Sequence, residues 1–422
     1  MNAADAMMAG RLGAETLAAV AVGGSVWLMT FTLALGVLMA ISPITARYFG
    51  AGRPEMIGRY TRQGIYIAVA FGAVVATLAQ LFAEPLLVAV RIDPGFRDLT
   101  VGYIGAIAWG APGIYIFLAL RFTTEGIGKT KPIMYTSMLA LLCNIFLNYV
   151  FMFGHFGVPA MGAVGCGYAS AVTMWIIMIT LASHVLVAAP YKPLKIFARL
   201  APPRPEVLRE IVILGIPIAI TITAEVGLFA AVSILVGTRG AEITAAHQVA
   251  INFASMMFMV PLAMSSAITI QAGQLLGAGR LERARYSAGL GIALCAIFMS
   301  FSAIMMLLFR DVVVGLYTDN TAVKGIAISL LLVAAAFQVA DGVQIGAAGA
   351  LRAYKDTRVP MAINIVTYWG VGFPLAFLAA ITYNAPPNFI WGGFVIGLSI
   401  AAVLLTWRFQ RLSRRVILQG SG

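Results

Sequence analysis

The sequence predicts an all-α membrane protein whose chain crosses the bilayer many times, and three observations support this fold class. First, 61% of the 422 residues are hydrophobic and only 10% are charged, with a mean hydropathy of +0.94, whereas a soluble domain has about 25% charged residues. Second, the apolar runs continue for about twenty residues, long enough for a helix to cross a ~30 Å hydrocarbon core. Third, the chain repeats itself once at long range, which indicates two related halves.

The same composition excludes several classes of protein. A soluble enzyme, a nucleic-acid-binding module and a disordered chain would all be far more polar. A β-barrel would alternate apolar and polar residues within each strand. The three cysteines, Cys143, Cys166 and Cys295, all lie in apolar stretches and offer no disulfide framework or metal spacing. No nucleophile or cofactor motif occurs, so we expect neither an enzyme nor a bound cofactor.

Eleven apolar runs are long enough to span the bilayer, and a short apolar segment, residues 1–8, precedes the first of them. Each run is bounded by charged or turn-forming residues, which mark the membrane surfaces. The runs lie near residues 16–41, 64–83, 99–120, 132–154, 162–189, 209–236, 243–270, 286–309, 322–345, 360–382 and 390–409.

The basic residues predict the orientation of these spans. Of the 28 lysines and arginines, 22 fall in one alternating set of loops, which includes the C-terminal tail, and only 6 fall in the other set. Scattered solubilising charges would not alternate from loop to loop. Because cytoplasmic loops carry the excess of basic residues, we expect the first set and the C-terminus to be cytoplasmic. This asymmetry also accounts for the net charge of +12.

The long-range repeat divides the chain into two parallel halves. Residues 10–19 match 237–246, and the Gly-Ala-Gly-Arg motif at 50–53 recurs at 277–280, both at an offset of 227. The matching motifs fall on the same side of the membrane, which indicates repeats related by an axis along the membrane normal. A proline-rich stretch lies between the halves. We therefore predict an N-terminal helical lobe (1–189), a cytoplasmic linker (190–208) and a C-terminal helical lobe (209–422).

The repeat also predicts a shortened first span. Residue 1 aligns with residue 228, so nothing in the first half matches most of the span at 209–236. By symmetry the first half should begin with a full span that ends near residue 8. We expect that this chain lacks about twenty N-terminal residues of a twelve-span protein, through a misassigned start or a truncation.

Three acidic residues lie at membrane depth and are the first candidates for ion chemistry. Glu225 lies in the middle of the sixth run, Asp341 lies well inside the ninth, and Asp5 lies in the short N-terminal segment. Such residues usually face a cavity or bind a cation. Each carboxyl could take up a proton, and two carboxylates brought together could hold Na⁺ through their oxygens. The alternative is a structural carboxyl that is hydrogen-bonded to a neighbouring helix.

Polar and aromatic neighbours of these acids are candidates for supporting contacts or for lining a cleft. Asn144 and Asn148 are four residues apart and so share one helix face. The alternative for such amides and hydroxyls is an ordinary hydrogen bond between helices. His247 lies near the end of its span without a second histidine nearby, which favours a packing role. The other candidates are Thr223, Gln338, Gln344 and the aromatic Phe337.

Several motifs together resemble one known family. They occupy residues 5–13, 50–53, 144–148, 162–167, 245–250, 277–280 and 349–356. With these motifs the chain resembles, over essentially its whole length, the multidrug and toxic compound extrusion (MATE) transporters, in their NorM-type bacterial branch. The resemblance implies two pseudo-symmetric six-helix bundles around a central cleft, here with a truncated first helix. It also implies export of lipophilic, often cationic compounds in exchange for Na⁺ or H⁺.

The resemblance also implies roles for individual residues. In the family, acids on the first, seventh and tenth helices serve cation coupling, and the matching positions are Asp5, Glu225 and Asp341. Some members carry a further acid on the fifth helix, where this chain has Asn148. This difference favours the Glu225–Asp341 pair as the ion site.

We therefore expect a monomeric, multi-pass antiporter of the bacterial inner membrane, with a cytoplasmic C-terminus. Its partners would be small-molecule drugs and the lipid bilayer, without nucleic acid, and its coupling ion would be Na⁺ or H⁺. Two alternatives remain at this point. One is a flippase for lipid-linked intermediates, which would need a more basic cleft, and the other is a transport-inactive membrane protein that has lost its first helix.

Overall fold

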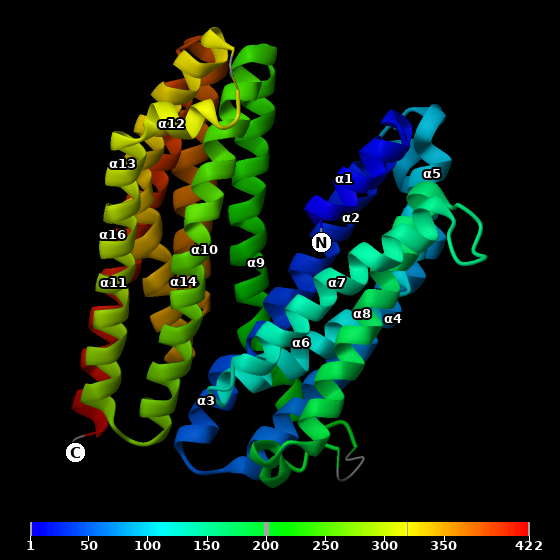
Figure 1. The fold of residues 1–422 in the computed structure, drawn as a ribbon. Coiled ribbons are helices and arrows are strands. Elements are labelled where there is room, and N and C mark those ends of the chain that lie inside the picture. The colour runs from blue at the N-terminus through cyan, green and yellow to red at the C-terminus, as the bar shows by residue number, and fades with distance from the viewer. Residues whose placement is uncertain (1, 198–201, 319, 421–422) are drawn as a thin grey trace. The chain divides into compact units, whose positions relative to one another are not determined.

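The computed structural model describes residues 2–197, 202–318 and 320–420, and within these ranges the chain forms helices and short connections without any strand (Figure 1). Part of the predicted linker, residues 198–201, lies outside the described residues. Ten of the described helices are long and apolar enough to cross a membrane, and a bent helix pair makes an eleventh span if it is counted as one. The eleven predicted spans are therefore consistent with the structure.

Eight α-helices and one 3₁₀ helix form the first half of the described chain. The 45° bend between α5 and α6 interrupts the predicted third span, close to Pro112, whose missing amide proton and fixed φ favour a break. The elements are α1 (Asn2–Leu12), α2 (Ala14–Met39), α3 (Ile41–Gly50), α4 (Pro54–Ala89), α5 (Pro94–Ala108), α6 (Ala111–Gly126), α7 (Lys131–Phe153), α8 (Gly162–Val187) and the 3₁₀ helix η1 (Ala189–Leu194).

The second half contains longer helices and two π-helical segments. The tenth predicted span, which contains Pro374, is one continuous helix with two changes of winding at η2 and η3. The elements are α9 (Pro205–Gly237), α10 (Ala241–Gly277), α11 (Leu281–Leu308), α12 (Arg310–Gly315), α13 (Thr321–Ala353), α14 (Arg358–Ile365), η2 (Val366–Gly372), α15 (Phe373–Phe377), η3 (Leu378–Thr382) and α16 (Pro387–Gly420).

Most helices extend beyond the apolar runs that predicted them. For example, the run at 64–83 lies within α4, whose 36 residues begin at Pro54 and include Arg59 and Arg62. Hydropathy detects the part of a helix that suits the hydrocarbon core, whereas the polar turns at its ends remain helical in the interfacial region.

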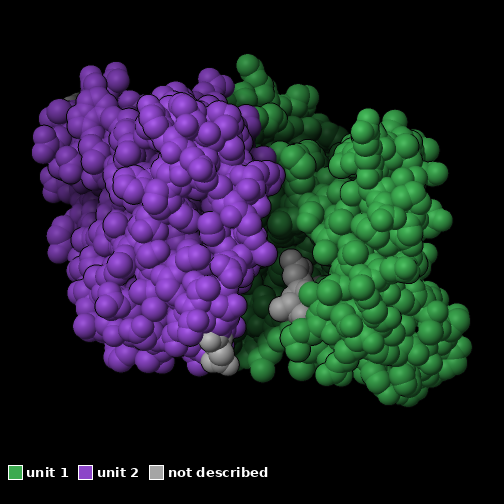
Figure 2. All heavy atoms as spheres, turned by 90° about the horizontal axis from the view of Figure 1, so that it is seen from above, with its two compact units in different colours: residues 1–45, 53–219 green, residues 46–52, 220–422 purple. Residues whose placement is uncertain are grey.

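The chain divides into two compact units (Figure 2). The first comprises residues 1–45 and 53–219, and the second comprises 46–52 and 220–422. Residues 46–52, from the first half of the sequence, thus group with the second unit, and residues 205–219, at the start of α9, group with the first. In the first unit, Tyr60 on α4 donates a hydrogen bond to Glu210 near the start of α9. In the second unit, Arg47 near the end of α3 donates to the carbonyl of Ala353 at 2.9 Å.

The repeated Gly-Ala-Gly-Arg motif ends a helix at both of its occurrences, since α3 ends at Gly50 and α10 ends at Gly277. The second glycine of each copy, Gly52 and Gly279, has a positive φ of 65° and 72°, which suits glycine in a tight turn. The first glycine has a different role. A Cβ on Gly50 would overlap the backbone of Gln274, and a Cβ on Gly277 would overlap the carbonyl of Arg47. The motif therefore combines a turn with a close contact between the ends of α3 and α10.

Candidate functional site

The candidate site in the second unit is built on α13. This helix is buried along most of its second half, from Phe337 to Ala353. Asp341 points into the unit and is 4% exposed. Glu225, in the middle of α9, is partly exposed and lies close enough to Asp341 for the two charges to interact. The structure therefore brings together two of the three acids that the sequence singled out, Glu225 and Asp341.

Several buried polar side-chain atoms on α9 and α13, the helices that carry Glu225 and Asp341, have no hydrogen-bond partner among the described residues. They are Asp341 Oδ1, Gln344 Oε1, Gln338 Nε2 and Thr223 Oγ1. The remaining amide atoms of the two glutamines form hydrogen bonds. Gln344 Nε2 donates to the hydroxyl of Tyr368 at 2.6 Å, and Gln338 Oε1 accepts from the hydroxyl of Ser302 at 2.9 Å. Unpaired buried oxygens are costly unless something binds them. This region thus offers carboxylate and amide oxygens, the donors that hard cations prefer.

Such a donor set suits Na⁺ or a proton better than a transition metal. Within the described residues there is no cluster of three or more histidine, cysteine, aspartate or glutamate side chains that could hold a metal ion. The two carboxylates of Glu225 and Asp341 and the neighbouring amides offer oxygen donors, which is the ligand type that the sequence predicts for a Na⁺ site; the binding of an ion stays a prediction.

Asn364 extends this polar region and was not among the sequence candidates. It lies on α14, just before η2, is fully buried, and neither its Oδ1 nor its Nδ2 has a hydrogen-bond partner among the described residues. Tyr368, which accepts from Gln344, follows on η2 itself. π-helical turns are frequent at functional sites because they re-aim side chains. The sequence could have identified Asn364, because it is an amide in an apolar span, like Asn144 and Asn148.

Arg352 corrects one expectation from the sequence. The distribution of basic residues assigned it to a cytoplasmic loop, but it lies in the last turn of α13 and is only 7% exposed. Its Nη2 donates to the hydroxyl of Ser265 on α10 at 2.6 Å, and that hydroxyl donates to the carbonyl of Ile345 at 2.6 Å. Its charge interacts with that of Glu225. The charged groups inside the second unit are therefore not only acidic.

The repeat explains how Arg352 comes to turn inward. The Ala-Leu-Arg sequence at 119–121 recurs at 350–352, so Arg121 is the counterpart of Arg352 in the first half. Arg121 pairs with Glu125 one turn later on the same helix at 2.8 Å. The acid in the equivalent place after Arg352 is Asp356, but Asp356 is bound by Arg408 from α16 at 2.7 Å. Because its local partner is already paired, Arg352 instead bonds to Ser265 in the α10–α13 contact.

The first unit holds a separate polar cluster around Asp5. Asp5 lies on α1, is 5% exposed, and accepts a hydrogen bond of 2.6 Å from Nδ2 of Asn148 on α7. Asn144, one turn away, lies within hydrogen-bonding reach of Asp5 and also donates to Ser170 at 3.4 Å. The shared helix face expected for Asn144 and Asn148 thus points at the acid, and in this cluster the amides partner a single carboxylate.

Two further sequence candidates lie in the apolar core of the second unit. Phe337, which was considered as a cleft residue, is 2% exposed and packs against Trp391 and Phe394 at 5.8 and 6.0 Å between ring centroids. His247 is 1% exposed; its Nδ1 accepts from Trp391 at 3.1 Å and its Nε2 lies 2.9 Å from the Ser233 hydroxyl. With both ring nitrogens partnered, His247 has the packing role that the sequence favours.

Comparison with known proteins places this chain beside others of similar length. The family model described as MatE matches residues 1–150 and 217–378. The chain is 38% identical to "Multidrug resistance protein MdtK" from Photorhabdus laumondii, over all of this chain and 94% of that protein. It is 37% identical to "Multidrug resistance protein PmpM" from Pseudomonas aeruginosa, over 99% of this chain and 89% of that protein.

Solved structures show that the fold is shared as well. A crystal structure of a MATE protein in the bent conformation superposes with a TM-score of 0.91 at 20% identity, over all of this chain and 92% of that one. The eukaryotic MATE transporter AtDTX14 superposes with a TM-score of 0.86 at 20% identity, over 99% and 94% of the two chains. At this identity the likeness establishes the two-lobed helical fold.

Proposed function

Because this chain belongs to the MatE family, we propose that it is a secondary active antiporter of a bacterial inner membrane that exports drugs in exchange for Na⁺ or H⁺. Two bacterial relatives over nearly its full length carry the name multidrug resistance protein. Its helices are long and apolar enough for a multi-pass membrane protein. As a transporter it would need no catalytic centre, in keeping with the lack of an enzyme motif in the sequence.

The observation that carries the proposal is the pair of interacting carboxylates inside the second unit. Glu225 and Asp341 bear two negative charges, and Arg352 supplies one positive charge that interacts with Glu225. With all three ionised, the group has a net charge of −1 in a poorly solvated interior. One bound Na⁺ or one proton would neutralise this charge, which is the requirement for a coupling ion at membrane depth.

The coupling would follow from this charge balance. A cation entering from outside would bind Asp341 and Glu225 and stabilise the conformation in which their oxygens converge. A ligand shifts a conformational equilibrium by its difference in affinity for the two states. In this scheme cation binding promotes drug release outside, and cation release to the cytoplasm resets the transporter. The drugs themselves would be lipophilic and often cationic compounds.

The test is dye efflux from proteoliposomes driven by an imposed Na⁺ gradient or pH gradient. We expect Glu225→Gln and Asp341→Asn each to reduce cation-driven efflux by about tenfold or more, within the range of ordinary coupling energies. Two exposed acids provide matched controls, Glu206→Gln at the start of α9, the helix that carries Glu225, and Asp311→Asn on α12 in the second unit. Comparing the two gradients identifies the ion. Full efflux by both site variants would contradict the assignment of the ion site.

A further inference from the structure

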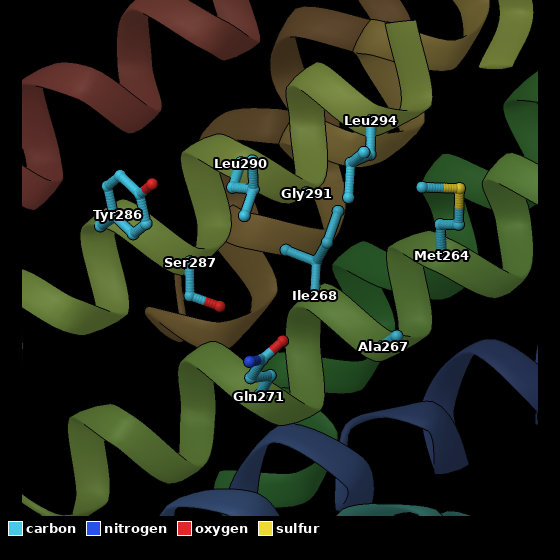
Figure 3. Close-up of a pocket in the computed structure, with 9 residues that line it drawn as sticks. All are labelled: Met264, Ala267, Ile268, Gln271, Tyr286, Ser287, Leu290, Gly291 and Leu294. Carbon is cyan, nitrogen blue, oxygen red and sulfur yellow. The ribbon is translucent and has the colours of Figure 1, made fainter. Parts of the chain in front are cut away.

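The second unit has a groove between α10 and α11 that the transport proposal does not use (Figure 3). Its volume is about 260 Å³, below the ~300–1,000 Å³ typical of pockets for drug-sized ligands. Its sides are apolar, with Met264 on α10 and Leu290 and Leu294 on α11. Leu290 and Leu294 are 49% and 44% exposed, so the groove opens to the surroundings of the unit.

The floor of the groove is formed where one helix lacks a side chain. Gly291 lies against Ile268, and a Cβ at this position would collide with the isoleucine side chain. Ile268 is buried, whereas Ala267 beside it on the rim is exposed. A narrow apolar channel of this kind fits a hydrocarbon chain, which needs length and little width.

One end of the groove is polar, and it is the end nearer the short connection between the two helices. Gln271, Tyr286 and Ser287 lie together at this end, opposite Met264 and Leu294 (Figure 3). α10 ends at Gly277 and α11 begins at Leu281, so the polar end lies a few residues from the connection between them, which the apolar runs of the sequence place at a membrane surface. The groove therefore runs from the interfacial level toward the apolar interior.

Arg283 on α11 places a positive charge beyond the polar end of the groove. Arg283, Ser287, Leu290 and Leu294 are spaced at i, i+4, i+7 and i+11, which places them on one face of α11. Arg283 is exposed, and Arg280, one turn before it, is exposed as well. The neighbouring acid, Glu282, lies about 100° away around the helix. Along its length the groove thus presents apolar side chains first, then the hydroxyls of Tyr286 and Ser287 with the amide of Gln271, and finally the guanidinium of Arg283.

We infer that the α10–α11 groove is a binding site for one anionic glycerophospholipid. One acyl chain would lie along Leu290 and Leu294, the glycerol ester region would meet Ser287 and Tyr286, and the phosphate would meet Arg283. Basic residues at the interfacial end of a groove between transmembrane helices are the usual determinants of such recognition. The same arginine would repel the cationic drugs expected as substrates, which separates this site from the transport site.

Native mass spectrometry of the detergent-purified full chain tests this inference without relying on transport. The protein is titrated with phosphatidylglycerol and, in parallel, with phosphatidylcholine of the same acyl chains. We expect tighter binding of phosphatidylglycerol, by about fivefold, since one arginine near the surface contributes roughly that factor toward an anionic lipid. Arg283→Gln should remove this preference, and Ala267→Phe, which fills the rim, should weaken the binding of both lipids.

Matched controls carry the same substitutions elsewhere. Arg414→Gln removes an exposed charge from α16, and Ala70→Phe adds bulk at an exposed position on α4. Both should retain wild-type lipid binding. The inference is overturned if the wild type binds the two lipids equally, if Ala267→Phe and Arg283→Gln behave like their controls, or if the cationic dye ethidium displaces the bound phosphatidylglycerol.

Discussion

The buried, positively charged side chain of Arg352 distinguishes the polar interior of the second unit from an ordinary pair of membrane acids. Arg352 is bonded to Ser265 and interacts electrostatically with Glu225. Its charge leaves the group with one unit of negative charge instead of two. An ion site that binds one cation and later releases it benefits from this balance, because two unneutralised carboxylates would hold the cation too tightly for transport.

The role of Arg352 gives a prediction at the residue scale. Arg352→Met should lower the free energy of unfolding by about 3–5 kcal/mol, the usual cost of removing one partner from a buried charged pair. Arg352→Lys keeps the charge and should lose less. Thermal unfolding of the purified protein, with Arg358→Met as the control at an exposed position on α14, measures the difference. Equal stability of Arg352→Met and its control would show that the interactions of the Arg352 charge do not stabilise the second unit.

The sequence could predict some residues of this site but not others. Glu225 and Asp341 stand out because an acid in a long apolar run is rare and costly. Arg352 does not, since a basic residue near the end of an apolar run looks like a cytoplasmic anchor. Its inward orientation depends on Asp356 being bound by Arg408, 52 residues further along the chain. Such a contact between distant segments has no local signature in the sequence.

At the scale of helices, the two copies of the glycine motif join the ends of α3 and α10 through backbone contacts. Gly50 packs on the backbone of Gln274, and Gly277 packs on that of Arg47. Close helix approach at small residues is the main way in which helices associate in a membrane. The contact also explains why residues 46–52 group with the second unit rather than with the first.

Alanine substitutions in the motif should have graded effects on stability. Gly50→Ala should cost about 3 kcal/mol, because the new Cβ meets backbone that cannot move aside easily. Gly52→Ala meets no atom within 4 Å but keeps a positive φ, which costs about 1–2 kcal/mol. Gly289→Ala on α11, also without a neighbour within 4 Å, should be neutral or slightly stabilising. Thermal midpoints of the three purified variants give the order, and a reversed order would contradict the packing argument.

Helix positions were largely predictable, whereas the irregularities within helices were not. Apolar runs of helical length located the spans because the bilayer imposes both length and composition on them. A proline within an apolar run can kink its helix. Pro112 lies beside a 45° break between α5 and α6, whereas Pro374 lies in a helix that continues through two π-helical segments. Which response a proline produces depends on the neighbouring helices that satisfy the freed backbone groups.

On the scale of the whole molecule, the internal repeat predicted two related halves, and the structure adds that the halves hold different polar sites. The polar cluster of the first unit has one carboxylate, that of Asp5, with amide partners from α7. The polar region of the second unit has two carboxylates, those of Glu225 and Asp341, and the guanidinium of Arg352, with unpaired amide and carboxylate oxygens. The repeat could not foretell this difference, since the acids do not occupy matching positions in the two halves.

This difference predicts that cation binding is a property of the second unit. A ligand that binds only the folded state stabilises it, by about 2.7 kcal/mol at one hundred times its dissociation constant. The stabilisation of the purified protein by Na⁺, or by a lowered pH, should therefore disappear in Asp341→Asn and in Glu225→Gln. In Asp5→Asn it should persist in full, whatever happens to efflux, because the amide still lies beside Asn148 and the second unit is unchanged. A loss of cation-dependent stabilisation in Asp5→Asn alone would instead place the ion site in the first unit.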